Sequence, residues 1–257
     1  MPESFDALAR LTPAFPAACR GRVHSIFSRV VNVQMRCGET ERLLALVSPD
    51  LPAVPDSVCL PPPLLAAFTV GETVILEDRR LSWRDHAVRL RADSRYTGKL
   101  DALEGRPCVH ALEACTANLR CGLDLLPGAL RLRAVQALRE GRWQAFLGLG
   151  SGLTPSFDDA CVGMAAVYTA MGLPLPPLAD LSVTTDVSAR YLRLAQEGYF
   201  GEPLLALIHA LWADEATIAG AVQALLAVGA SSGSDMLYGV RIGLEKALCG
   251  EETVGEG

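Results

Sequence analysis

Three aspartates and a run of glycines, serines and threonines are the residues of this sequence whose types and spacing could do chemistry. Segment 148–159 reads GLGSGLTPSFDD and holds three glycines, a proline and two adjacent acids. Glycines at this spacing let the backbone take positive φ and approach a ligand closely. Thr154 is predicted as the N-cap and Pro155 as the first residue of an apolar helix over 155–171. A buried helix start of this kind collects unpaired N–H groups and a positive dipole end, so it predicts an anion site.

Asp158 and Asp159 lead directly into this apolar helix. If the helix is buried, both carboxylates cannot face bulk water, and at least one needs a partner. An internal Arg, Ser or Thr, a divalent metal, or an amide or hydroxyl group of a ligand would serve. The alternative is that the glycines only permit a tight turn and the acids only favour the helix start. The spacing matches neither a Walker A loop nor a dinucleotide-binding fingerprint, so the ligand stays open.

A second segment, 228–239, resembles the first. A shift of 76 residues superposes three pairs of like residues: Ser156 on Ser232, Asp159 on Asp235, and Gly163 on Gly239. Each segment runs from a small-residue loop through an acid near a helix start to a glycine four residues later, on the same helical face. A glycine inside a helix costs ~1 kcal/mol. We therefore expect the two helices to cross closely and bring their N-termini together; the alternative is that each glycine serves a different neighbour.

These two segments, with a capped helix start between them at 184–188, define the candidate site. Asp158, Asp159 and Asp235 are the candidate catalytic acids. The candidate substrate-binding residues supply backbone N–H groups and hydroxyls: Gly150, Ser151, Gly152, Thr154, Ser156, Thr184, Thr185, Ser188, Ser231, Ser232 and Gly233. The sequence assigns no metal ligand and no certain cofactor, and Mg²⁺ is a candidate because carboxylates stand beside an anion site.

Composition narrows the class of protein. The chain of 257 residues is 50% hydrophobic and 20% charged, which is ordinary for a globular protein of one large or two modest domains. A net charge of −6 without a dense basic cluster argues against nucleic acid as a partner. The N-terminal segment lacks the apolar run of a signal peptide, and the two longest uncharged runs contain prolines or end in a Gly/Ser loop. We expect a cytoplasmic protein without a membrane partner.

The eight cysteines form no C-x-x-C pair and the four histidines are scattered, so there is no zinc framework. In a reducing compartment we expect most of these thiols to be small buried hydrophobes. Cys161 is the exception to watch, because a thiol near a helix N-terminus can have a lowered pKa.

The pattern along the chain changes from β to helical near residue 96. Short β-rich runs at 22–33, 42–48, 73–77 and 87–91 come first, and six prolines between 49 and 63 predict an extended surface connector. Helical periodicity then predicts helices at 103–119, 127–147, 155–171, 186–197, 202–212, 214–228 and 234–249. The predicted fold class is α+β, with a small N-terminal β-rich domain (1–95) followed by a larger all-helical domain (96–257) that carries the glycine-rich loops.

The combined motifs resemble those of the AllH (YlbF) family. They are GxGxGLTPSxDD at 148–159, the hydroxyls of Thr184, Thr185 and Ser188, and SSGxDxLxG at 231–239. The helical half matches in these motifs and the β half only in general pattern. Position 157 departs from the family, which usually has a glycine there. The ring of Phe157 would fill space that a glycine leaves open.

This resemblance implies a subunit of oxamate carbamoyltransferase, an enzyme of anaerobic allantoin degradation that forms a hetero-oligomer with two other subunits, one resembling a CoA-ligase-type protein. Its reaction exchanges a carbamoyl group between phosphate and oxamate. Carbamoyl phosphate, oxamate and oxalurate are small anions, which suits an anion-binding helix start. No Ser-His-Asp or Cys-His signature is present, so direct transfer between bound substrates is expected. The alternative is a non-catalytic anion-binding or scaffold subunit of a multi-protein complex.

Overall fold

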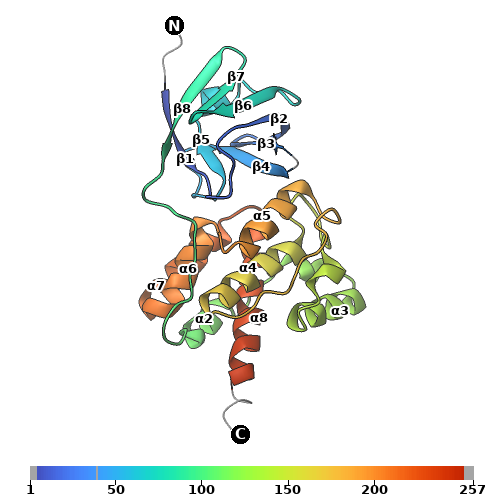
Figure 1. Cartoon of the computed structure of the whole chain (residues 1–257). Coiled ribbons are helices and arrows are strands. Elements are labelled where there is room, and N and C mark those ends of the chain that lie inside the picture. Colours follow the sequence, from blue (N-terminus) through green and yellow to red (C-terminus); the bar gives the residue numbers. More distant parts are fainter. Residues whose placement is uncertain (1–4, 39, 252–257) are drawn as a thin grey trace. The chain divides into compact units, whose positions relative to one another are not determined.

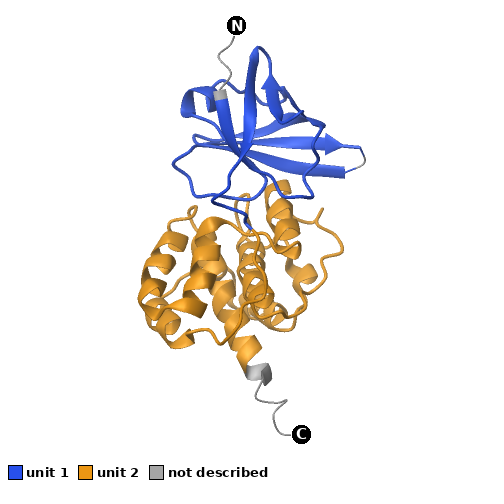
Figure 2. Cartoon of the chain, turned by 60° about the vertical axis from the view of Figure 1, so that its left-hand side comes forward, with its two compact units in different colours: residues 1–98 blue, residues 99–257 orange. Residues whose placement is uncertain are grey.

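The computed structural model describes residues 5–38 and 40–251. The chain divides into two compact units, Met1–Gly98 and Lys99–Gly257 (Figures 1 and 2). Each unit buries hydrophobic side chains of its own.

The first unit is a closed barrel in which the strand order is β1-β5-β4-β3-β2-β6-β7-β8. Its strands are β1 (Phe5–Arg10), β2 (Cys19–Ile26), β3 (Val30–Cys37), β4 (Thr40–Val47), β5 (Ser57–Cys59), β6 (Thr73–Glu77), β7 (Arg80–Trp83) and β8 (His86–Ala92), with a short helix α1 (Pro62–Leu65). β1 pairs in parallel with β8, and β4 with β5; the other neighbours are antiparallel. Alternate residues fill the interior, where Trp83 stacks on Phe68 with ring centroids 4.6 Å apart.

The structure corrects the predicted fold class, α+β with a small β-rich domain. The β part is a barrel closed on itself, and with the short helix α1 it forms one compact unit, while α2 to α8 belong to the other. The run 22–33 is divided between two strands, β2 and β3. β5 lies inside the proline-rich segment that was expected to be only a connector. All three of its residues are buried, so it lacks the alternation by which a strand exposed on one face is recognised.

The second unit is helical. Its elements are α2 (Val109–Thr116), the 3₁₀ turn η1 (Gly122–Leu125), α3 (Gly128–Arg139), the 3₁₀ turn η2 (Trp143–Phe146), α4 (Ser156–Ala170), α5 (Asp186–Gln196), α6 (Glu202–Ala213), α7 (Glu215–Leu226) and α8 (Ser232–Glu251). The predictions for α4 to α8 are confirmed within two residues at each end. The predicted helix 127–147 is wrong in length, because the chain turns at Gly141 (φ 70°) after α3. No helix in the described part of the chain is long and apolar enough to cross a membrane.

Helix α4 is the core of this unit, and it crosses α8 at very close range. A Cβ on Gly163 would lie 1.9 Å from the Met236 carbonyl oxygen, and one on Gly239 would lie 1.9 Å from the Ala160 carbonyl oxygen. The two contacts are reciprocal under the 76-residue shift, as across a local two-fold axis. The predicted crossing at the two glycines is confirmed.

Candidate anion site at the starts of α4 and α8

The loop before α4 presents open backbone donors. Gly148, Gly150 and Gly152 have φ values of 81°, 133° and 88°, so the positive φ that their spacing predicts is present. Residues 150–153 are exposed. Among the described residues, no acceptor takes a hydrogen bond from the N–H groups of 150–154. The loop therefore holds a set of free donors just before the positive end of a helix.

Helix α4 begins one residue later than predicted. Pro155 is the N-cap, and its carbonyl accepts the N–H groups of Asp158 and Asp159 at 2.9 and 3.1 Å. The Thr154 hydroxyl, expected to cap α4, instead lies 2.8 Å from the Ser232 hydroxyl at the start of α8. This hydrogen bond joins the two helix starts, which confirms that the N-termini meet.

Asp158 is fully buried, and protein donors meet both of its oxygens. Oδ1 accepts the Gly148 N–H at 2.8 Å, and Oδ2 accepts the hydroxyls of Thr184 and Ser188 at 2.5 and 2.6 Å. Each bond crosses from α4 to another segment. Asp158 therefore holds the glycine loop and the start of α5 together.

Thr185 fastens the same loop from the side of α5. Its hydroxyl oxygen accepts the Ser188 N–H at 3.0 Å as the N-cap of α5, and the hydroxyl donates to the Leu153 carbonyl. A serine or threonine at this position is the usual cap. The loop is thus positioned by side-chain bonds to Asp158 and Thr185.

Asp159 is 4% exposed, and its Oδ2 has no hydrogen-bond partner among the described residues. Burial raises the pKa of Asp159 to about 8. The hydroxyls of Ser232 and Thr154 lower this pKa, and the charges of Asp235 and Asp158 raise it. At neutral pH the free protein therefore holds this carboxyl mostly protonated.

Asp235 occupies the corresponding place on α8 and is fully buried. Its Oδ1 accepts the Gly122 N–H at 2.6 Å, while no described donor meets Oδ2 in hydrogen-bond geometry. Burial raises the pKa of Asp235. The Gly122 N–H and the hydroxyls of Ser156 and Ser231 lower it. The backbone of η1 therefore reaches this second acid directly.

Gly122 is a site residue that the sequence reasoning missed. A Cβ there would lie 2.0 Å from the Ser156 hydroxyl oxygen, so any larger residue would have to displace that hydroxyl. A single glycine between Cys121 and Leu123 carries no local signal of this contact. Only the tertiary fold reveals it.

The predicted site residues fall into three groups. Around the joined helix starts lie Thr154, Ser156, Asp159, Ser232 and Asp235. Around Asp158 and the loop carbonyl lie Thr184, Thr185 and Ser188. The two loops contain Gly150, Ser151, Gly152 and Ser231, and Gly233 lies in the first turn of α8. Gly233 is buried against α7, where a Cβ would lie 1.9 Å from the Leu225 carbonyl oxygen.

Two residues near the site differ from expectation. The Phe157 ring is fully buried with its centroid 5.7 Å from that of Phe146, so it lies in the core and does not fill the loop. Cys161 is also fully buried. Burial, followed by the charges of Asp158 and Asp159, raises the pKa of this thiol, so Cys161 does not have the lowered pKa that its place near a helix N-terminus made worth watching.

The side chains do not fit a metal ion. Among the described residues there is no group of three or more His, Cys, Asp or Glu that could hold one. Asp158 already accepts three protein donors. Asp159 and Asp235 alone would supply only part of the six oxygen ligands that Mg²⁺ requires.

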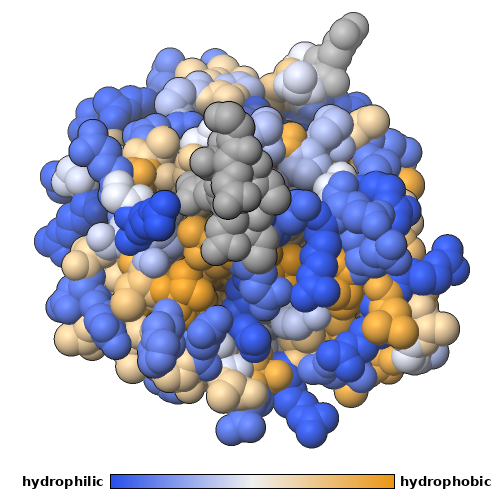
Figure 3. All heavy atoms as spheres, turned by 90° about the horizontal axis from the view of Figure 1, so that it is seen from below, coloured by the Kyte–Doolittle hydropathy of each residue, from blue (hydrophilic) through white to orange (hydrophobic). Residues whose placement is uncertain are grey.

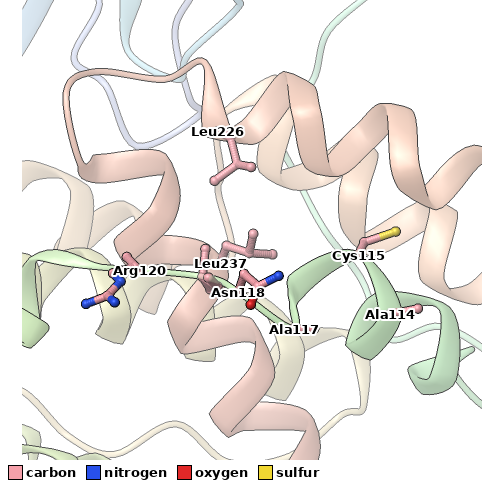
Figure 4. A pocket seen from close by; sticks show the side chains of 8 residues that line it. Ala114, Cys115, Ala117, Asn118, Arg120, Leu226 and Leu237 are labelled. Atoms are coloured by element: carbon pink, nitrogen blue, oxygen red, sulfur yellow. The ribbon is translucent and has the colours of Figure 1, made fainter.

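Neither of two hollows in the described part of the chain is lined by a predicted site residue. In the helical unit, a hollow of about 320 Å³ lies among α2, the end of α7 and α8, where Cys115, Leu226 and Leu237 line it (Figure 4). In the barrel, one of about 760 Å³ is lined by Arg20 and Arg22, among others.

A closed barrel joined to a helical unit, with two buried acids at glycine- and serine-rich helix starts, defines a two-unit protein with a candidate anion site. Two family models match it: the AllH family N-terminal domain over residues 4–95, and oxamate carbamoyltransferase subunit AllH over residues 146–244. The chain belongs to the AllH family, and the resemblance seen in the sequence is confirmed. The family description names a subunit of a multi-subunit enzyme. No solved structure matches the chain.

Proposed function

We propose that this chain is a subunit of a carbamoyltransferase-type enzyme, like oxamate carbamoyltransferase, and that it binds a small anionic substrate at the joined starts of α4 and α8. The family description supports the enzyme class. One observation carries the site: the free N–H groups of 150–153 lie directly before Thr154, whose hydroxyl bonds to that of Ser232 beside the buried Asp159. Helix-start N–H groups bind phosphate and carboxylate oxygens. Carbamoyl phosphate, oxamate or a similar compound has such oxygens.

The proposed reaction is direct transfer between bound substrates. The bond between the carbamoyl carbon and the nitrogen of oxalurate breaks, a bond from that carbon to a phosphate oxygen forms, and the phosphate proton goes to the departing nitrogen. The products are oxamate and carbamoyl phosphate. Cys161, the cysteine on α4, is buried with a raised pKa, which argues against a thiolate intermediate at this helix.

In this proposal, the loop and the three aspartates have different roles. Asp158 and Thr185 position the loop, the loop N–H groups bind the anionic end of the substrate, and Asp159 and Asp235 lie behind it as candidate catalytic acids. We further propose that the chain acts in the cytoplasm, together with other subunits, through two domains, 1–95 and 96–257.

A second candidate function is a scaffold subunit, which would bind its partners through exposed apolar side chains on the helical unit. Leu125 of η1 is 87% exposed and Leu132 of α3 is 73% exposed. The face shown in Figure 3 carries hydrophobic patches among hydrophilic residues. Exposed apolar patches mark interaction surfaces. Such a surface would serve either function, so catalysis has to be measured.

The test uses the chain copurified with the other subunits of its complex. Oxalurate and phosphate are supplied, and carbamoyl phosphate is measured. We expect product with the wild type and with Asp180→Asn, a control at an exposed acid, and at least a tenfold loss with Asp159→Asn. Inactivity of the complete wild-type complex would remove the oxamate assignment. Full activity of Asp159→Asn would favour the scaffold function.

A further inference from the structure

The hollow of about 760 Å³ in the barrel unit is lined by charged and polar residues. Besides two glycines, these are Arg20 and Arg22 from β2, Gln34 and Arg36 from β3, Glu41 from β4 and Thr73 from β6. The three arginines are exposed, whereas Gly21 and Met35 between them are buried, so the arginines lie on the outer face of the barrel. None of the lining residues has an aliphatic or aromatic side chain.

Strand pairing brings the three arginines together. Arg20 and Arg36 lie directly opposite each other across β2 and β3, and Arg22 follows two residues later on the same face of β2. Opposite residues in an antiparallel pair have Cα atoms about 4.5–5.5 Å apart. Like charges directly opposite each other destabilise a sheet. An anion shared by the arginines would remove this repulsion.

The acids of the described chain do not balance this positive charge. Arg36 pairs with Glu41 at 2.7 Å, and both side chains of this ion pair are exposed. Arg22 donates to the Gly71 carbonyl at 3.1 Å, and the Arg20 side chain has no hydrogen-bond or ion-pair partner among the described residues. Three arginines against one glutamate leave the lining with a net charge of +2, in a chain whose net charge is −6.

We propose that this hollow binds a compact ligand with two phosphoryl groups, either inorganic diphosphate or the diphosphate part of a nucleotide. A guanidinium group matches phosphate oxygens with parallel N–H donors. Arg20 and Arg36 would share one phosphoryl group, and Arg22 would bind the other. Arg36 is available for this contact because an exposed ion pair such as that with Glu41 is weak.

The lining favours recognition of the phosphoryl groups alone. It offers no aromatic ring on which a base could stack, as sites for single-stranded nucleic acid do. It also offers no aliphatic side chain to the apolar residues of an acidic peptide. The proposal concerns the barrel unit and does not depend on the function proposed for α4 and α8.

Three probes test the ligand class. Binding of inorganic diphosphate, phosphate and ADP to the full chain is measured by calorimetry, at one salt concentration and without Mg²⁺. We expect diphosphate to bind at least tenfold more tightly than phosphate, because the second phosphoryl group adds a charge-assisted contact. ADP should bind about as tightly as diphosphate. Weaker binding of ADP would still support the proposal and would assign the ligand as free diphosphate.

Variants locate the site. Arg20→Gln should weaken the binding of diphosphate about tenfold or more. Arg89→Gln is the matched control, because Arg89 also lies opposite an arginine, Arg80, on the same barrel but does not line the hollow. Glu41→Gln removes the acid of the lining and should tighten binding. All three substituted positions are exposed, so these variants should fold.

The outcomes keep this proposal apart from the proposed function. Equal weakening by Arg20→Gln and Arg89→Gln would overturn the proposal, because net charge alone would then explain the effect. Equal affinity of the wild type for phosphate and diphosphate would also overturn it, as would much tighter binding of ADP than of diphosphate. Phosphate bound at the starts of α4 and α8 is told apart by Asp159→Asn, which should leave the binding that depends on Arg20 unchanged.

Discussion

The start of α4 and the start of α8 are two versions of one arrangement. Both have a small-residue loop, a serine, a buried aspartate and a glycine at the helix crossing, in register under a 76-residue shift. At α8 the acid accepts the Gly122 N–H of η1, while at α4 the corresponding acid lies behind an exposed loop, and Oδ2 of each acid has no donor among the described residues. The difference arises outside the repeated segments, at Gly122. The protein therefore supplies a backbone N–H to the acid of one half only.

The largest expected effect comes from breaking the crossing that makes the two halves equivalent. Gly163→Ala or Gly239→Ala would place a methyl group 1.9 Å from a backbone carbonyl oxygen of the partner helix. We expect a loss of ~3 kcal/mol or more in the free energy of unfolding, or no folding, because the backbones must separate. Urea unfolding measures this.

Gly220→Ala is the matched control. Gly220 lies inside α7, and a Cβ there meets no atom within 4 Å. The change should stabilise the protein by up to ~1 kcal/mol, as expected for Gly→Ala in an open helix position. Equal changes in the free energy of unfolding for Gly220→Ala and Gly163→Ala would mean that the close crossing does not limit the size of the residue at 163.

The next effect separates the two adjacent acids of α4. Asp158→Asn replaces an acceptor of hydroxyl and backbone donors by an amide, and should lower the free energy of unfolding by about 1–3 kcal/mol. The loop should also become more accessible, which hydrogen exchange of residues 148–153 would report. Unchanged stability would show that these three bonds contribute little.

Asp159→Asn, in contrast to Asp158→Asn, should raise the free energy of unfolding at pH 7. The pKa of Asp159 in the folded protein is about 8, against an ordinary value of 3.8, so the folded state binds more protons between these values. Its contribution to stability is therefore full below pH 4 and is lost as the pH rises to about 8, at up to ~1.4 kcal/mol per pH unit.

Removing this group should flatten the pH dependence between 4 and 8 and make the variant more stable than the wild type at pH 7. Unfolding midpoints across this pH range, for both proteins, provide the measurement. A variant that is less stable than the wild type at pH 7 would show that the carboxylate has a partner in the protein.

The smallest effect concerns Ser232 and Ser156, each of which lies beside the aspartate of the other helix. Ser232→Ala should raise the pKa of Asp159, and Ser156→Ala that of Asp235, because each hydroxyl favours the ionised form of the acid on the other helix. Carboxyl chemical shifts followed through a pH titration would show this. If either variant shifted the acid of its own helix instead, the proposed two-fold relation would be wrong.

Local patterns were enough to predict much of the helical unit. Helices α4 to α8 were recognised because their periodicity and their flanking turns agree. Gly163 and Gly239 predicted the crossing because a glycine inside a helix is costly without a packing reason. The spacing of Gly148, Gly150 and Gly152 predicted their positive φ values.

The rest depended on contacts that no local pattern encodes. Neighbouring residues on a helix point about 100° apart, so Asp158 and Asp159 face different surroundings. Only the positions of Thr184 and Ser188 show that protein donors meet Asp158 on both oxygens. Gly122 lies far from both loops in the sequence and reaches Asp235 only in the fold. The roles assigned to the site residues stay predictions.

The most direct test of the account is the number of protons released when oxamate binds. At pH 7 the free Asp159 carboxyl is mostly protonated, and an amide N–H would favour its ionised form. Calorimetry in buffers of different ionisation enthalpy counts the protons. We predict the release of close to one proton per oxamate from the wild type and none from Asp159→Asn. Binding without proton release from the wild type, or equal release from both proteins, would contradict the proposal that the substrate binds beside Asp159.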